Sequence, residues 1–309
     1  MDGVLVIDKP VGPTSHDVVA RVRRAIGERR VGHTGTLDPG ASGVLPLVVG
    51  RATRLARFLS ASDKSYEAVV RLGFSTDTAD AQGRATGPVR QGTVPSLETI
   101  DAALDWFRGT FLQQPPAYSA KMIEGHRSYK LARAKSRTTE NRPGPPDRPD
   151  LPELVSVTTQ AIEIISLHGD TVTLRVDCSG GFYVRSLAHD LGERLGTGAH
   201  LVSLRRTRSA DFSLRETIAL GIVEREPAAA IAAMVPLNGM LLGLSSVVLT
   251  AQGAKHAGHG RDLTALDLAS DLPAAVPSWI RLLDQDGVLL GIARPGASPG
   301  ALHPSIVLM

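Results

Sequence analysis

Short apolar runs recur along the chain and are separated by turn-forming residues. VLVI at 4–7 predicts a short buried strand, and VLPLVVG at 44–50 predicts a second strand. Residues 66–74 alternate apolar and polar side chains, as a half-buried strand does. Residues 154–166 and 171–177 have strand patterns as well. These runs predict a sheet at the centre of the molecule.

Three other segments have helical periodicity. The first covers residues 17–26, and Thr14 or Ser15 can cap its N-terminus. Its apolar residues recur every four positions on one face, whereas its arginines point largely away from that face. We therefore expect a basic helix face that is available to a partner. The apolar residues are Val18, Val22 and Ile26, and the arginines are Arg21, Arg23 and Arg24.

The other two predicted helices lie further along the chain. Residues 97–108 form an amphipathic pattern that begins after Pro95-Ser96, and a later helix starts near Tyr183. The later helix has Leu187, Leu191 and Leu195 on one face. Together with the strands, these helices indicate a mixed α+β fold.

The character of the chain changes near residue 240. Short strands are predicted at 245–250 and within 279–293, where the Asp-Gln-Asp-Gly sequence suits a hairpin turn. We therefore expect a larger catalytic domain over residues 1–244 and a small β-rich domain over 245–309. A length of 309 residues agrees with one large domain and one smaller one.

Composition restricts the compartment and the classes of site. Cys178 is the only cysteine, which excludes an intrachain disulfide and a zinc site built on several cysteines. The first residues, MDGVLVIDKP, lack the pattern of a signal peptide, and no apolar run approaches membrane-spanning length. We expect a cytoplasmic protein that does not enter a membrane.

Basic charge is concentrated in two blocks of the first 150 residues. Lys and Arg outnumber Asp and Glu by 11 to 5 over residues 9–71 and by 8 to 3 over 120–149. Residues from about 120 to 152 contain few apolar side chains after position 132 and many breakers, so an exposed basic insertion is expected there. This distribution is what a groove that binds a polyanion needs.

One acidic residue stands out in a glycine-rich loop. The segment GHTGTLDPGASGVL at 32–45 contains Asp38 as its only carboxylate, among glycines and small hydroxyl residues. Such a loop suits a catalytic nucleophile, but Asp before Pro is also common in simple turns. The residues of this segment alone leave both interpretations open.

Several motifs, taken in order, resemble the bacterial TruB family. They are GVLVIDKPVGPTSHDVV at 3–19, GHTGTLDPGASGVL at 32–45, KSYEA at 64–68, GFSTDTADAQG at 73–83, PPAYSAKMIEGHRSYKLAR at 115–133 and SGGFYVRSLAHDLGERLGTGAHLVSLRR at 179–206. The resemblance covers about residues 1–214. It implies the pseudouridine synthase fold, a mixed and largely antiparallel sheet with flanking helices, and pseudouridine formation at uridine 55 in the T-loop of tRNA.

The resemblance also assigns residues. It implies that Asp38 is the nucleophile, that Tyr66 stacks on the base and assists loss of the C5 proton, and that Arg185 pairs with Asp38. Uridine must be detached at N1, turned and rejoined through C5, without a metal or cofactor. Asp38 could attack C1' or remove a sugar proton to give a glycal, and the sequence does not separate these routes. Among the substrate-binding residues implied, His33 fills the space of the flipped base, and Lys9 is expected to support the catalytic fold. The full set is His33, Leu204, Tyr183, Lys9, Arg127 and Tyr129.

Two positions depart from the family pattern. The family commonly has one residue between the Ala and the Lys of the 115–133 motif, whereas here Lys121 follows Ala120 directly and Met122 comes next. In addition, Gly40 stands where a larger apolar residue is common. The tail resembles a PUA-like RNA-binding module. Its net negative charge argues against a broad phosphate-binding surface, although Lys255, His256 and Arg261 could contact an RNA end.

Four other classes of protein or site share some of these features. A calcium loop at Asp77, Asp80 and Gly83 lacks the required Glu, and an aspartyl-phosphate enzyme would need a carboxylate where Gly40 stands. An RNA-binding protein without catalysis and a guide-RNA-dependent enzyme with protein partners remain as alternatives. The basic insertion favours a monomeric enzyme that binds the T stem-loop of tRNA without an obligatory protein partner.

Overall fold

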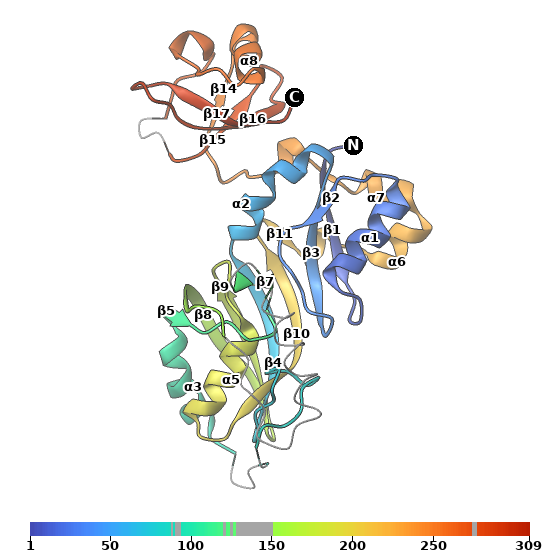
Figure 1. Ribbon diagram of the computed structural model, residues 1–309, viewed down its shortest axis with the longest axis vertical. Helices are drawn as coiled ribbons and strands as arrows, with labels where there is room; N and C mark the ends of the chain where they lie inside the picture. The colour runs from blue at the N-terminus through green and yellow to red at the C-terminus, as the bar shows by residue number, and fades with distance from the viewer. Residues whose placement is uncertain (88, 90–93, 120–121, 124–125, 128–150, 274–276) are drawn as a thin grey trace.

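A large mixed sheet forms the centre of the molecule. The computed structural model describes residues 1–309 except 88, 90–93, 120–121, 124–125, 128–150 and 274–276 (Figure 1). The main path of the sheet has the order β12-β1-β3-β10-β4-β9-β8-β5. Its strands are β12 (Ile218–Ala219), β1 (Gly3–Lys9), β3 (Ala41–Val49), β10 (Ala199–Ser209), β4 (Lys64–Leu72), β9 (Thr171–Cys178), β8 (Val155–His168) and β5 (Gly109–Gln113), with β2 (Val31–His33), β11 (Phe212–Ser213) and β13 (Val235–Pro236) paired beside them.

Strand β10 joins the two halves of this sheet. It runs parallel to β3, with Leu204 opposite Ala41, and antiparallel to β4, with Arg206 opposite Tyr66. Most other pairs are antiparallel, including β1 with β3 and β4 with β9. The predicted α+β class and the mixed, largely antiparallel sheet are therefore confirmed.

The side chains of each strand divide between two hydrophobic clusters. On β1, Leu5 and Ile7 pack into the cluster that includes the helices α1 and α5, whereas Val4 and Val6 pack into a second cluster on the other side. The helices near the large sheet are α1 (Ser15–Ile26), α2 (Ala56–Ala61), α3 (Leu97–Leu104), α5 (Val184–Arg194), α6 (Leu220–Arg225) and α7 (Pro227–Ala232). Short 3-10 turns are η1 (Gly50–Leu55), η2 (Asp105–Phe107), η3 (Leu214–Glu216) and η4 (Leu237–Gly239).

Helix α1 has the predicted apolar face, and its cap is now defined. Thr14 is the N-cap and forms a capping box with Asp17, which leaves Ser15 available for a different contact. Its basic face is partly occupied, because Arg21 makes a bidentate ion pair with Glu224 at 2.6 Å. Arg23 donates to the carbonyl of Val31. The basic face predicted to be available to a partner is therefore smaller than the sequence indicates.

A separate four-stranded sheet lies near the C-terminus (Figure 1). It consists of β14 (Ser246–Val248), β15 (Ile280–Leu283), β16 (Leu289–Pro295) and β17 (Leu302–Val307), with α8 (Ala251–Gly258) and η5 (Ala265–Asp267) beside it. The predicted turn is confirmed: β15 and β16 are antiparallel, and the Asp284 carboxylate accepts from the backbone N–H groups of Asp286 and Val288. Within the described ranges, no helix is long and apolar enough to cross a membrane.

This second sheet packs against the region of η1 and α2. Arg51 donates to the carbonyl of Leu308 at 2.5 Å. The Arg57 guanidinium lies 4.4 Å from the ring centre of Trp279, a cation–π arrangement. These contacts attach the C-terminal strands to the back of the large sheet, away from the helices α1 and α5.

Candidate active site

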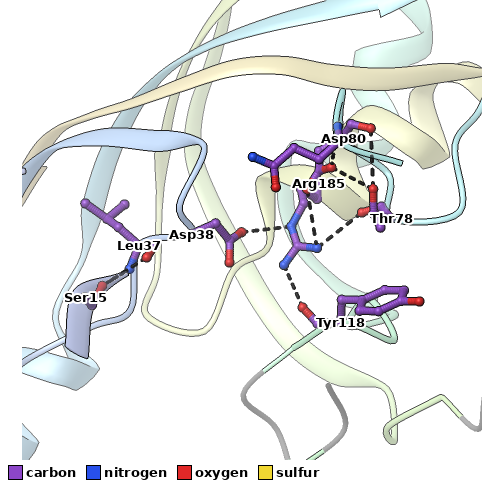
Figure 2. Close-up of polar contacts among 8 residues, drawn as sticks. Ser15, Leu37, Asp38, Thr78, Asp80, Tyr118 and Arg185 are labelled. Carbon is purple, nitrogen blue, oxygen red and sulfur yellow. Dashed lines mark hydrogen bonds and ion pairs between the residues drawn. The ribbon is translucent and has the colours of Figure 1, made fainter. Parts of the chain in front are cut away.

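The loop that carries Asp38 is fixed by backbone hydrogen bonds on both sides. The Ser15 hydroxyl accepts from the Leu37 N–H at 2.8 Å and donates to the Leu37 carbonyl at 3.0 Å (Figure 2). Gly12 donates from its backbone to the carbonyl of Pro39 at 2.8 Å. The first turn of α1 and the segment before it therefore hold the residues on either side of Asp38, which limits the positions its carboxylate can take.

Arg185 and Asp38 form an ion pair. The Arg185 Nε lies 3.0 Å from Asp38 Oδ2 (Figure 2). The arginine side chain is 8% exposed, whereas the aspartate side chain is 43% exposed. A buried, rigid cation thus orients a carboxylate that solvent or a substrate can reach.

The rest of the Arg185 guanidinium is also engaged. Nη1 donates to the Thr78 carbonyl at 3.2 Å, and Nη2 donates to the Tyr118 carbonyl at 2.8 Å. Nη1 also lies 3.8 Å from Asp80 Oδ2 (Figure 2). Because contacts approach the planar guanidinium from several directions, its orientation is determined by the fold before any substrate arrives.

Gln113 fixes the start of the helix that carries Arg185. Its side chain accepts from the Tyr183 N–H at 2.8 Å and donates to the Tyr183 carbonyl at 3.0 Å. Tyr183 is the N-cap of α5, but its side chain makes no capping hydrogen bond. The buried amide of Gln113 replaces a conventional cap and sets the direction of the first turn.

Tyr66 lies in β4 and is buried. Burial raises the pKa of its phenol, while the positive charge of Arg206 and a hydrogen bond to that side chain act in the opposite direction. The Asp38 charge raises the pKa further. Tyr66 lies opposite Arg206 of the neighbouring strand β10.

Lys9 has no exposed surface. Its Nζ donates to the carbonyls of Ala41 at 2.7 Å and Pro10 at 3.0 Å. Burial lowers the pKa of Lys9 to about 8, although the Asp38 carboxylate acts in the opposite direction. In this position Lys9 supports the end of the catalytic loop and does not offer a surface to a substrate, so its place among the substrate-binding residues does not fit the structure.

The remaining predicted residues lie around this centre. His33 ends β2 and packs edge-on against the ring of His16, with 5.2 Å between ring centres. Leu204 is half-buried on β10, opposite Ala41 at the start of β3. Burial raises the pKa of the Tyr183 phenol. The backbone of Arg127 belongs to the hairpin of β6 (Met122–Ile123) and β7 (His126–Arg127), but its side chain, Tyr129, Lys121 and most of the predicted insertion lie outside the described residues.

The structure adds residues that the sequence did not single out. Asp80 entered the sequence analysis only as part of a calcium loop that lacks the required Glu, yet its carboxylate lies beside Arg185 and accepts from the Thr78 hydroxyl at 2.6 Å. The sequence feature that could have indicated Asp80 is the 73–83 motif, which contains more polar residues than a turn needs. Ser15, Gln113 and Arg206 had no distinctive pattern, because each acts through partners that are distant in sequence.

The structure also describes the rejected calcium loop and the departure at position 40. The Asp77 carboxylate accepts from the Arg84 N–H at 2.8 Å, and no metal-binding group of three or more ligands occurs among the residues described. A Cβ at Gly40 would lie 3.4 Å from the Gln82 amide nitrogen. Gln82 is therefore the neighbour that a side chain at position 40 would touch.

The fold is that of the pseudouridine synthase class. A chain in a solved structure, an H/ACA RNP bound to a substrate RNA containing 2'-deoxyuridine, is similar over 99% of this chain and 85% of its own length, with a TM-score of 0.73 and 25% identity. A protein of Solibacter usitatus called tRNA pseudouridine synthase B is 43% identical over the full length of both chains. One of the same name from Gloeobacter violaceus is 46% identical over 72% of this chain and 73% of its own.

Two family models match the chain directly. The N-terminal domain of the TruB family pseudouridylate synthases matches residues 23–184, and the tRNA pseudouridylate synthase B C-terminal domain matches residues 185–248. This chain belongs to the TruB family of pseudouridylate synthases.

Proposed function

We propose that this chain converts uridine to pseudouridine at position 55, in the T-loop of tRNA, with Asp38 as the nucleophile and without a metal or cofactor. The observation that carries the proposal is the contact between the accessible Asp38 carboxylate and the buried Arg185, at 3.0 Å. Relatives of high identity over the full chain have the name tRNA pseudouridine synthase B. Their name and the site geometry support the same reaction.

The reaction needs an ionised carboxylate next to the sugar. Asp38 either attacks C1' as the N1–C1' bond breaks, or removes the C2' proton to give a glycal, and both routes release uracil as an anion held in the site. The uracil turns, and C5 bonds to C1'. In the first route this step displaces the carboxylate; in the second, Asp38 returns the proton to C2'. Arg185 holds Oδ2, so the other carboxylate oxygen is expected to react.

The final step removes the proton from C5 and restores the C5–C6 double bond. Tyr66, supported by Arg206 on the adjacent strand, is the residue proposed to stack on the base and assist this loss. His33 is proposed to occupy the space of the flipped uridine, and Leu204 and Tyr183 to contact the base. All three belong to elements that adjoin the Asp38 loop or Arg185.

RNA recognition is proposed to use shape and phosphate contacts. Arg127, Tyr129 and the basic insertion of about 120–152 would clamp the T stem-loop, as its excess of lysine and arginine suggests. We propose a monomeric, cytoplasmic enzyme with a catalytic domain at 1–244 and a PUA-like domain at 245–309. The separate hydrophobic cluster of the second sheet supports this division.

The purified chain, with no other protein, should release tritium from an isolated T-arm labelled at C5 of its uridines. One equivalent per RNA is expected, and a T-arm with cytidine at the target position should release none. Binding without release would indicate an RNA-binding protein. Because a structural relative comes from an H/ACA RNP, release that requires added guide RNA and protein partners would indicate the guide-dependent mode instead.

A further inference from the structure

Three cationic side chains are buried beneath the catalytic loop. Lys9, Lys64 and Arg206 are 0%, 6% and 1% exposed. Among the ion pairs of the described residues, none joins Arg206 to a carboxylate. A buried charge without a counterion is costly, so the hydrogen bonds of Arg206 must offset its desolvation. Those hydrogen bonds indicate what Arg206 does.

Arg206 contacts the catalytic loop on both sides of Asp38. Its Nη2 donates to the carbonyl of Gly35 at 3.1 Å, and its Nε donates to the carbonyl of Val44 at 2.7 Å. Gly35 precedes Asp38 in the loop, and Val44 follows it in β3. One rigid guanidinium therefore spans the two ends of the segment that presents the nucleophile.

The same guanidinium reaches the second predicted catalytic side chain. Arg206 lies directly opposite Tyr66 in the pairing of β10 with β4. Burial raises the pKa of the Tyr66 phenol, and the positive charge of Arg206 opposes this shift, as expected for two side chains that lie close together. The loop and the phenol thus share one buried partner, although they belong to strands that are separated by β10.

Two glycines near Asp38 lie close to Arg206: Gly35 in the loop and Gly43 in β3. At Gly43, with φ +102°, a Cβ would lie 2.2 Å from the Arg206 carbonyl oxygen, which excludes any larger residue. At Gly35 a Cβ would touch Arg206 Nη1 at 3.4 Å. The close approach of the Arg206 backbone thus requires glycine at position 43, and Gly35 lies against the guanidinium.

We propose that Arg206 is a positioning residue that holds the loop of Asp38 and the phenol of Tyr66 at fixed positions relative to each other. This inference rests on the proposed function, because it assigns Arg206 a role in that reaction. Substitutions of Arg206 and Tyr66 should therefore have non-additive effects on the reaction rate. Substitution of Arg206 should change the affinity for tRNA little.

A double-mutant cycle with single-turnover kinetics on the T-arm tests this. Arg206→Lys should lower the rate constant about tenfold to a hundredfold, with the T-arm Kd within about twofold of the parent value. Combined with Tyr66→Phe, the loss should be at least about fivefold smaller than the product of the two single losses. Arg205→Lys is the matched control, because Arg205 is adjacent in β10 but is half-exposed and bonded to Asp8.

Arg206→Met is the second variant, because an apolar side chain of similar volume is often tolerated in place of a buried charge. It should fold and lose at least as much activity as Arg206→Lys. The positioning role would be overturned if the losses of rate constant in the single variants simply multiply in the double variant. It would also be overturned if the substitutions change only Kd, or if both Arg206 variants fail to fold. If the parent protein makes no pseudouridine in the T-arm, the proposed function fails instead, and that outcome is visible before any variant is made.

Discussion

Arg185 Nε lies 3.0 Å from Asp38 Oδ2, and this ion pair joins the start of α5 to the loop between β2 and β3. The arginine is buried and held by two backbone carbonyls, whereas the aspartate is accessible. The fixed partner is therefore the cation, and it orients the Asp38 carboxylate. This asymmetry determines which substitutions should be damaging.

Replacing Arg185 with lysine should be severe although the charge is kept. An ammonium cannot reach Asp38 and the carbonyls of Thr78 and Tyr118 at once, so the carboxylate loses its fixed direction. We expect the single-turnover rate on the T-arm to fall about a hundredfold to a thousandfold. Arg194→Lys is the control, because Arg194 is on the same helix but stacks on Trp106 at the surface. A loss under threefold for Arg185→Lys would contradict the orienting role.

Asp80→Asn should have a smaller effect. Its carboxylate lies 3.8 Å from Arg185 Nη1, too far for a direct hydrogen bond but close enough to favour one orientation of the guanidinium. We expect kcat to fall about tenfold, with KM nearly unchanged. Asp77→Asn provides the comparison, since Asp77 bonds the Arg84 backbone in the same hairpin. Equal losses in both variants would mean that only the hairpin fold matters.

Ser15→Ala tests how the catalytic loop is anchored. The substitution removes both hydrogen bonds to Leu37 and should cost about 2 kcal/mol of stability, measured by urea unfolding. It should also lower kcat about tenfold, because the residue before Asp38 is released. Thr14→Ala, the neighbouring cap, should cost about 1 kcal/mol without lowering kcat. If the two variants lose the same activity, the anchor has no specific role.

The buried Lys9 predicts a rise of stability with pH. Burial lowers the pKa of Lys9 to about 8, against 10.5 for an ordinary lysine, so between these values the unfolded chain binds more protons. The free energy of unfolding should therefore increase from about pH 8 to 10 through this group. Lys9→Met lacks the contribution, and comparison with it cancels the similar shift of Lys64. Parallel stability profiles of the two proteins would show that folding does not lower the pKa of Lys9.

Much of the fold was predictable because its strands and helices bury apolar residues at regular spacing. The strands β1, β3, β4, β8 and β9 and the helices α1, α3 and α5 follow the predicted segments closely. The predicted helix at 97–108 ends earlier, since the chain tightens into η2 after Leu104. Strand β10 was not predicted, because Arg205, Arg206 and Arg208 mask its pattern. Arg206 is buried there by hydrogen bonds that only the folded chain provides.

The motif residues of the candidate site could be predicted from the sequence, but the residues that position them could not. The family motifs point to Asp38 and Arg185, and the structure brings these two together. Gln113 and Ser15 act on backbone groups that are distant in sequence, so no local pattern indicates them. The structure thus supplies the geometry that turns a list of motif residues into a mechanism.

The most direct test of the account is pseudouridine formation by Asp38→Asn on an isolated T-arm. The substitution keeps the size of the side chain and removes the charge that Arg185 orients. We predict that the variant binds the T-arm with a Kd within about threefold of the parent protein and releases no tritium from C5 in a single-turnover assay, while the parent releases one equivalent. Measurable pseudouridine at the target position from the variant would contradict the assignment of Asp38 as the nucleophile.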